Sequence, residues 1–198
     1  MTVDLRAQML QLLPIEKGHF RYESGHHSDS WMRLELLYLH PLRMRQFTDD
    51  LARRLSKYEI DAICGPLVEG AFVALMVASQ MGLPFTYAER LDSGQSDALY
   101  PVRYRLPGAL RKEVKGRRVA IVNDVISAGS AVRGTFADLI ACGAQPVIVA
   151  ALAVLGDTFG EFAAANRLGL EAIVQMTNHL WTPDACPLCK AGESLDVT

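Results

Sequence analysis

The sequence contains no apolar run long enough to cross a membrane. A membrane-spanning helix needs about 20 consecutive apolar residues, whereas the longest apolar stretch, residues 146–155, has the length of one buried strand. Residues 1–13 mix Asp4, Arg6 and Gln8 among leucines, without the order of charged, apolar and small residues that a signal peptide shows. We therefore expect no membrane partner and no signal peptide.

Cysteine and lysine are both scarce. The four cysteines, Cys64, Cys142, Cys186 and Cys189, are too few and too scattered for a disulfide-stapled secreted domain, which indicates a cytoplasmic protein. The formal charge is -2, which argues against a broad basic surface for nucleic acid. Only five of the 20 basic residues are lysine, and the rest are arginine. The planar guanidinium group of arginine can form two parallel hydrogen bonds to a phosphate or carboxylate, which lysine cannot.

Length and composition indicate one domain. A chain of 198 residues that is 50% hydrophobic and 21% charged can bury a sizeable core. Within a single domain of residues 1–198 we distinguish an N-terminal helix and flap (1–40), an α/β core (41–177) and a C-terminal tail (178–198).

Apolar segments without polar alternation recur between helical segments from residue 41 onward. The patterns predict helices over 3–13, 41–57, 70–81, 131–142 and 159–168, and strands over 61–64, 85–88, 119–122, 147–155 and 172–176. Residues 18–37 indicate a hairpin-like flap, and 90–101 a mobile loop. Buried strands separated by helices are typical of a parallel sheet covered on both faces, so the fold class is α/β.

The most informative segment is residues 119–135. An apolar strand runs into Asn123 and Asp124, passes through small residues and enters a helix. Small residues let backbone N–H groups converge on an anion at a helix N-terminus, and Asp124 suits the hydroxyls of a sugar attached to that anion. The alternative is an ordinary strand-to-helix turn with a serine cap. The candidate anion-binding residues are Ser127, Ala128, Gly129 and Ser130.

This segment resembles the ribose-phosphate signature of the type I phosphoribosyltransferases, and the chain is most similar to their orotate phosphoribosyltransferase branch. Residues 18–28 resemble the N-terminal flap of that branch, 65–70 its pyrophosphate loop, and 82–90 the strand that leads to its hood loop. The resemblance covers most of residues 18–151. It implies a central parallel sheet with helices on both faces, plus an N-terminal flap or hood.

The resemblance also implies an activity and a set of site residues. Such an enzyme transfers the 5-phosphoribosyl group of phosphoribosyl pyrophosphate (PRPP) to a nitrogenous base, releases pyrophosphate, uses Mg²⁺ and forms a homodimer. Mg²⁺ would be held mainly by the ligand, so no protein cage is expected. Asp124 and Arg90 are implied as catalytic, and Phe20 and Glu23 as base-binding. The implied PRPP site comprises Asn123, Asp124, Ser127, Ala128, Gly129, Ser130, Leu67, Val68, Glu69 and Gly70.

Four features depart from that family pattern. Asn123 replaces the first of two acids, and residues 91–100 contain neither lysine nor histidine. Glu23 would repel an anionic base or pyrophosphate, and residues 153–157 lack the arginine that receives the orotate carboxylate. The acceptor base therefore stays open. A regulatory protein that senses PRPP or a nucleotide on the same scaffold is the alternative function.

The tail carries a Cys-x-x-Cys motif, Cys186 and Cys189, with His179 seven residues upstream. Two such cysteines can supply half of a tetrahedral zinc site, and His179 with one further ligand, or a second subunit, would supply the rest. A single motif is a weak signal, so a free thiol pair is the default interpretation. His26 and His27 are adjacent, and their side chains would diverge on a strand, so we expect no chelation by this pair.

Overall fold

The protein is built on one central sheet of six strands. The computed structural model describes residues 4–91 and 98–196. The strands are β3 (Ala62–Pro66), β4 (Phe85–Leu91), β5 (Arg103–Arg105), β6 (Arg118–Ile126), β7 (Gln145–Leu155) and β8 (Gly169–Met176). Their order is β5-β4-β3-β6-β7-β8, and every neighbouring pair is parallel except the antiparallel pair β4–β5. The expected α/β class with a mostly parallel sheet is confirmed.

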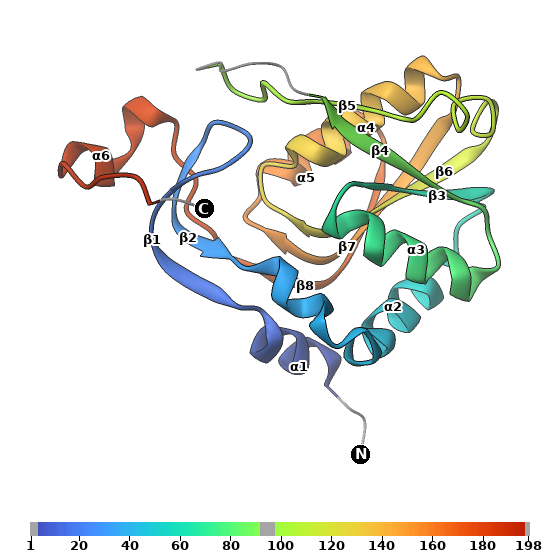
Figure 1. Ribbon diagram of the computed structural model, residues 1–198, viewed down its shortest axis with the longest axis horizontal. Helices are drawn as coiled ribbons and strands as arrows, with labels where there is room; N and C mark the ends of the chain where they lie inside the picture. The colour runs from blue at the N-terminus through green and yellow to red at the C-terminus, as the bar shows by residue number, and fades with distance from the viewer. Residues whose placement is uncertain (1–3, 92–97, 197–198) are drawn as a thin grey trace.

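Helices cover both faces of this sheet (Figure 1). They are α1 (Leu5–Leu12), α2 (Pro41–Leu55), α3 (Glu69–Met81), α4 (Ser130–Ala141) and α5 (Thr158–Ala165). Helices α1, α2 and α3 enclose one apolar core, in which Phe47 and Val77 are fully buried. Helices α4 and α5 enclose a second core on the other face, around Leu139 and Phe159. Because both faces are covered, β6 and β7 carry continuous apolar runs.

Local sequence signals start and stop several helices. Asp4 caps α1, since its Oδ1 accepts hydrogen bonds from the backbone N–H groups of Arg6 (3.1 Å) and Ala7 (3.2 Å). Pro41 occupies the first turn of α2, where its missing N–H has no partner to lose. Gly82 ends α3 in the left-handed region with φ 64°, a conformation that glycine adopts without strain.

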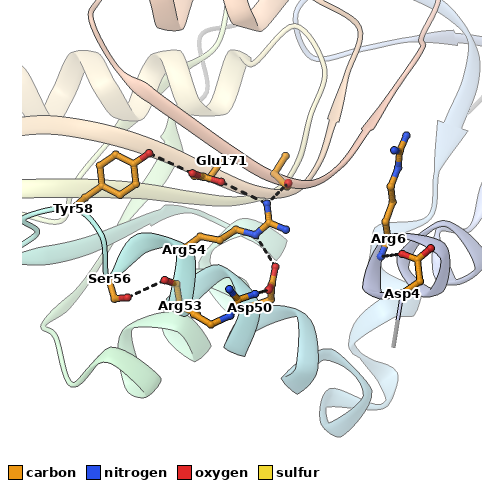
Figure 2. A network of polar contacts seen from close by, with 9 residues as sticks. Asp4, Arg6, Asp50, Arg53, Arg54, Ser56, Tyr58 and Glu171 are labelled. Carbon is orange, nitrogen blue, oxygen red and sulfur yellow. Dashed lines mark hydrogen bonds and ion pairs between the residues drawn. The ribbon is translucent and has the colours of Figure 1, made fainter. Parts of the chain in front are cut away.

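A polar network joins α2 to the edge strand β8 (Figure 2). The Asp50 carboxylate, 3% exposed, accepts from Arg54 Nε at 2.6 Å and also pairs with Arg53. Arg54 Nη1 donates to the Ala172 carbonyl at 2.9 Å and faces Glu171 Oε2 at 3.5 Å. The network therefore gives the buried Asp50 charge the partners that a buried carboxylate requires.

The N-terminal hairpin and the tail form a separate unit beside the sheet, at the left of Figure 1. The hairpin consists of β1 (Ile15–Arg21) and β2 (His27–Met32), and a 3₁₀ helix, η1 (Leu34–Leu39), follows it. The tail forms η2 (Pro183–Ala185) and α6 (Pro187–Lys190). Backbone hydrogen bonds of 2.8 and 2.9 Å pair His27 with Trp181, so the tail extends along the hairpin. The expected hairpin-like flap is confirmed.

Two expectations differ from the structure. Strand β6 continues through Asn123 and Asp124 to Ile126, because pairing with β7 carries it past its apolar part. Arg90 and Leu91 belong to β4 rather than to a loop, since they pair with β5. Half of the mobile loop expected over 90–101 falls on residues 92–97, which lie outside the described residues. Within the described ranges, every helix is too short or too polar to span a membrane.

Candidate active site

The turn between β6 and α4 lies at the carboxyl edge of the sheet. Chain connections run in opposite directions from β3 and β6, which makes this edge a topological switch point of the kind where α/β sheets bind ligands. Gly129 has φ 81°, and a Cβ atom there would lie 2.3 Å from the Phe159 ring. Only glycine therefore fits this turn. Ser130, the first residue of α4, has a buried hydroxyl without a hydrogen-bond partner among the described residues.

A cavity of about 320 Å³ opens beside this turn. Its lining comes from the hairpin (22–24, 31 and 32), from the start of η1 (34 and 35), from the β3–α3 turn (66–70), from Tyr104 and Leu155, and from 123–125 and 127–131 around the β6–α4 turn. A site built from two adjacent strand ends and a covering flap encloses a ligand on three sides. That arrangement suits a small molecule better than a macromolecule.

Acidic groups dominate the charge of this cavity. Glu23, Glu35, Glu69 and Asp124 line it, whereas the described lining residues include no lysine, arginine or histidine. Asp124 is 5% exposed, and burial raises its pKa to about 7, with the Glu69 charge adding to the rise. A hydrogen bond of 2.7 Å from the Val125 N–H to Asp124 Oδ1 opposes that shift. Four acids in one cavity favour a cation or hydroxyl groups as partners.

The β3–α3 turn packs closely on the end of β6. A Cβ atom at Gly70 would lie 2.0 Å from Asn123 Oδ1, so glycine is required for this approach. The Asn123 amide donates to the Val125 carbonyl at 2.9 Å, which fixes its orientation. The Leu67–Val68 peptide bond in this turn is cis. Together these contacts place the N-terminus of α3 and that of α4 at the same cavity.

Arg90 and Glu23 meet at the rim of the cavity. Arg90 Nε lies 3.4 Å from Glu23 Oε1, and the Tyr104 hydroxyl donates to the same oxygen at 3.0 Å. Burial raises the pKa of Glu23, although the bond from Tyr104 and the Arg90 charge lower it. The Arg90 side chain is 58% exposed and does not line the cavity, but its partner Glu23 does.

The structure brings most of the expected site residues together. Glu23, Leu67, Val68, Glu69, Gly70, Asn123, Asp124, Ser127, Ala128, Gly129 and Ser130 all line the cavity. Phe20 does not: it is 2% exposed on β1, and its ring packs against Trp31 with centroids 6.1 Å apart. Trp31, which packs against Phe20, lines the cavity itself.

Several residues that line the cavity were not predicted from the sequence. Tyr22 and Met32 lie within the predicted flap but were not singled out, and Tyr104 comes from a segment with no recognisable motif. Asn178 connects the site to the hairpin, because its Nδ2 donates to Ser127 Oγ at 3.1 Å. Its Oδ1 accepts from the hydroxyls of Ser28 (3.3 Å) and Ser30 (3.4 Å). The Tyr38 hydroxyl is also nearby, and burial beside Asp124 and Glu69 raises its pKa.

His179, one of the partners considered for the Cys-x-x-Cys motif, does not lie against it. The His179 ring stacks on Trp181 with centroids 5.6 Å apart, and its Nδ1 faces Asp29 Oδ2 at 3.3 Å, on the exposed side of the hairpin. Two other histidines, His19 and His27, lie against the two cysteines instead. The predicted divergence of His26 and His27 is confirmed, since His26 contacts Ser24 Oγ at 3.0 Å, away from the cysteines.

Comparison with known proteins gives matches over nearly the whole chain. The family described as "Phosphoribosyl transferase domain" matches residues 38–160. An orotate phosphoribosyltransferase of Caldanaerobacter subterraneus subsp. tengcongensis is 30% identical over 181 residues, which cover 90% of this chain and 86% of the relative. An orotate phosphoribosyltransferase of Thermotoga maritima is 27% identical, covering 89% of this chain and 87% of the relative.

Solved structures show the same fold at lower identity. The crystal structure of orotate phosphoribosyltransferase from Aeropyrum pernix matches with a TM-score of 0.64 and 19% identity, covering 87% of this chain and 93% of that chain. An adenine phosphoribosyl transferase from Trypanosoma brucei, crystallised with AMP, pyrophosphate and ribose-5-phosphate, matches with a TM-score of 0.68 and 19% identity. That match covers 87% of this chain and 79% of the other.

Proposed function

This chain belongs to the family of PRPP-dependent phosphoribosyltransferases, and from this premise we propose that its cavity transfers the 5-phosphoribosyl group of PRPP to a nitrogenous base. One observation carries the proposal. The Gly129 turn, Ser130 with its unpartnered hydroxyl, and the buried Asp124 carboxyl all line one cavity at the ends of β3 and β6. The turn and the hydroxyl suit a phosphate, and the carboxylate suits a sugar diol.

The β6–α4 turn would bind the 5-phosphate of PRPP. Residues 127–130 present small side chains at the N-terminus of the 12-residue helix α4, where backbone N–H groups and the helix dipole favour an anion. The hydroxyls of Ser127 and Ser130 add donors. Asp124 and Asn123, immediately before the turn, would accept hydrogen bonds from the ribose hydroxyls. These positions match the order of groups along PRPP, phosphate first and diol next.

The β3–α3 turn would hold the pyrophosphate group. This turn lies across the cavity from residues 127–130, which we call the phosphate turn. It lines the cavity at the N-terminus of the 13-residue helix α3 with Leu67, Val68, Glu69 and Gly70. Because the Glu69 carboxylate would repel a pyrophosphate group bound at this turn, a cation is needed between the two. The carboxylates of Glu69 and Asp124 are ligands that Mg²⁺ prefers, and they fit an ion that keeps most of its coordination for water and substrate.

The chemistry requires positioning and electrostatics rather than a protein nucleophile. A nitrogen lone pair of the base forms the new bond to the anomeric carbon while the bond from that carbon to the pyrophosphate oxygen breaks and its electrons leave with pyrophosphate. The proton that the uncharged base gives up would pass to the Glu23 carboxylate or to water. Bound Mg²⁺ would neutralise charge on the departing group. Arg90 at the rim would add a second positive charge, and Asp124 would orient the ribose.

The base would lie against the hairpin, and the cavity residues at this end limit which charge the base can carry. Glu23 and Glu35 face this end of the cavity, and the described lining residues offer no cation to a carboxylate. An uncharged base with N–H donors is therefore the acceptor that this lining fits, with Glu23 as an acceptor of one N–H. Orotate is the decisive comparison, because the relatives named above are orotate phosphoribosyltransferases.

The test is pyrophosphate release from PRPP and Mg²⁺ across a panel of purine and pyrimidine bases that includes orotate. We expect release with at least one base and formation of the matching nucleotide. Turnover of orotate at an ordinary enzymatic rate would contradict the preference for an uncharged base and leave phosphoribosyl transfer intact. PRPP binding without turnover of any base would favour the alternative function, a sensor of PRPP or a nucleotide.

We also propose that the chain forms a homodimer through η1 and its surroundings. Leu36, Leu39 and Leu42 are 51%, 68% and 84% exposed, and Phe72 of α3, 44% exposed, contacts Tyr38 of η1 with ring centroids 5.4 Å apart. Large apolar side chains gathered on one surface favour burial against a partner. Light scattering should give twice the mass of the chain, and Leu42→Glu should give the mass of one.

A further inference from the structure

Four possible metal ligands converge where the hairpin meets the tail. His19 comes from β1, His27 from β2, and Cys186 and Cys189 from the start of α6. His19 Nε2 lies 3.0 Å from His27 Nδ1, 3.4 Å from Cys186 Sγ and 3.6 Å from Cys189 Sγ. Cys189 Sγ lies 3.2 Å from His27 Nδ1, and the four atoms all lie within 4.8 Å of one another.

The orientation of the His19 ring directs a lone pair into this cluster. His19 Nδ1 lies 2.9 Å from the carbonyl oxygen of Glu193, which can only accept a hydrogen bond. Nδ1 therefore carries the proton of the neutral ring, and Nε2 presents its lone pair to the other three groups. A backbone carbonyl on the remote ring nitrogen is the usual outer partner of a metal-bound histidine.

Hydrogen bonding alone leaves this buried cluster poorly satisfied. His19, His27 and Cys186 are 2%, 5% and 0% exposed, so water has little access to them. The Nε2 lone pair of His19 faces three neighbours at once, and a single shared proton satisfies only one of them. A tetrahedral cation satisfies all four ligands together.

The backbone is shaped to hold the ligands in place. The register of β1 and β2 shifts between Lys17 and Phe20, so Gly18 and His19 lie in a bulge. A Cβ atom at Gly18 would lie 2.2 Å from Asp196 Oδ2, and that oxygen accepts from the His19 N–H at 2.9 Å. The tail thus contacts β1 at the bulge through Asp196 and pairs with β2 through Trp181 and His27.

We propose that His19, His27, Cys186 and Cys189 bind one structural Zn²⁺ ion that fastens the tail to the hairpin. Zinc with bond lengths of about 2.1 Å to nitrogen and about 2.3 Å to sulfur gives ligand separations of about 3.4–3.8 Å, and the four ligand pairs measured above lie 3.0–3.6 Å apart, so small shifts complete a tetrahedral site. Four protein ligands leave no open position, which defines a structural rather than a catalytic site. Soft thiolates with imidazoles favour zinc over magnesium.

The ion would support the candidate active site through the hairpin. A two-stranded hairpin is marginally stable alone, and this one is not hydrogen-bonded into the central sheet. It nevertheless supplies Tyr22, Glu23 and Trp31 to the cavity. Zinc would hold these residues in position without contacting substrate. The site is independent of the transferase reaction, so metal content tests it separately from activity.

The experiment measures metal in the full-length protein, expressed without a histidine tag and purified without a chelator. We expect one zinc per chain by elemental mass spectrometry, and visible absorption of tetrahedral, thiolate-bound cobalt after exchange with Co²⁺. Cys189→Ser should lose both signals; this cysteine is exposed, so the substitution is compatible with folding. Cys142→Ser, which removes a half-buried cysteine elsewhere, and His179→Ala should keep both.

Three results would overturn the proposal. The first is wild-type protein that contains no zinc and binds no cobalt. The second is Cys189→Ser that keeps one zinc per chain with an unchanged circular dichroism spectrum. The third is a native mass lighter by two hydrogens, since that would show a disulfide between Cys186 and Cys189. None of these measurements depends on PRPP or on a base.

Discussion

Asp124 is the residue on which the chemistry depends most. It lies at the end of β6, is almost fully buried and faces the cavity between the phosphate turn and Glu69. Replacement by alanine would remove the proposed acceptor for the ribose diol and a proposed ligand for Mg²⁺. We expect Asp124→Ala to lower kcat/KM at least about tenfold, or about 1.4 kcal/mol of barrier. Steady-state kinetics measure this, with Asp49→Ala on the surface of α2 as the control.

The protonation of Asp124 gives the reaction a pH dependence. Burial raises its pKa from 3.8 to about 7, and only the ionised carboxylate accepts from both ribose hydroxyls. We expect kcat/KM to fall as the pH drops below about 7, and Asp124→Asn to remove this dependence. The same shift affects the free energy of unfolding. As the pH rises from about 4 to about 7, the folded state keeps a proton on Asp124 that the unfolded state has already lost, so this group's contribution to stability declines. An identical pH profile in Asp124→Asn would assign the titration to another group.

Gly129 tests the geometry of the phosphate turn. Its φ of 81° and a Cβ position 2.3 Å from the Phe159 ring leave no room for a side chain. We expect Gly129→Ala to weaken PRPP binding and to lower the free energy of unfolding by more than about 1 kcal/mol. Gly160→Ala, in the adjacent helix α5 with open space at its Cβ, should be neutral or stabilising. Equal effects of the two substitutions would contradict the requirement for glycine at this turn.

Among the elements, α2 depends on its polar network as well as on its apolar face. Asp50 is buried between Arg53 and Arg54, which joins the helix to β8 (Figure 2). We expect Asp50→Ala to lower the free energy of unfolding by about 3 kcal/mol, since it leaves Arg54 without its nearest partner. Asp49→Ala should change it by less than about 0.5 kcal/mol, because Asp49 is half exposed. Urea denaturation of both variants measures the difference.

The regular elements could be predicted from sequence where the residue pattern alone determined them. Pro41 and an amphipathic pattern predicted α2, and the apolar run 147–155 predicted β7, because burial on both faces demands continuous apolar residues. Strand β5 has no clear sequence signal of its own, since three residues carry no periodicity. The polar end of β6 escaped prediction for a related reason: pairing with β7, rather than composition, extends it to Ile126.

The candidate site was predictable to a similar degree. The phosphate turn is continuous in sequence, so its residues 127–130 could be found together. The proposed zinc ligands come from three separated segments, and the bulge at Gly18 and the docking of the tail bring His19 and His27 to the cysteines. Proximity in sequence suggested His179, which lies seven residues from Cys186, but its ring faces Asp29 instead.

At the scale of the whole molecule, Asn178 joins the core to the hairpin. It contacts Ser127 of the phosphate turn and both Ser28 and Ser30 of β2. We expect Asn178→Ala to raise KM for PRPP about fivefold, which corresponds to about 1 kcal/mol, the typical value of one hydrogen bond. The exposed neighbour Gln175→Ala serves as the control in β8. An unchanged KM would show that the hairpin and the phosphate turn act independently.

A calorimetric titration of the protein with PRPP in the presence of Mg²⁺ tests the assignment of the cavity directly. We expect saturable binding of one PRPP per chain, weakened strongly in Gly129→Ala and little changed in Gly160→Ala. Absence of heat at millimolar PRPP, from protein whose circular dichroism shows it to be folded, would contradict the assignment of this cavity to a phosphoribosyl donor.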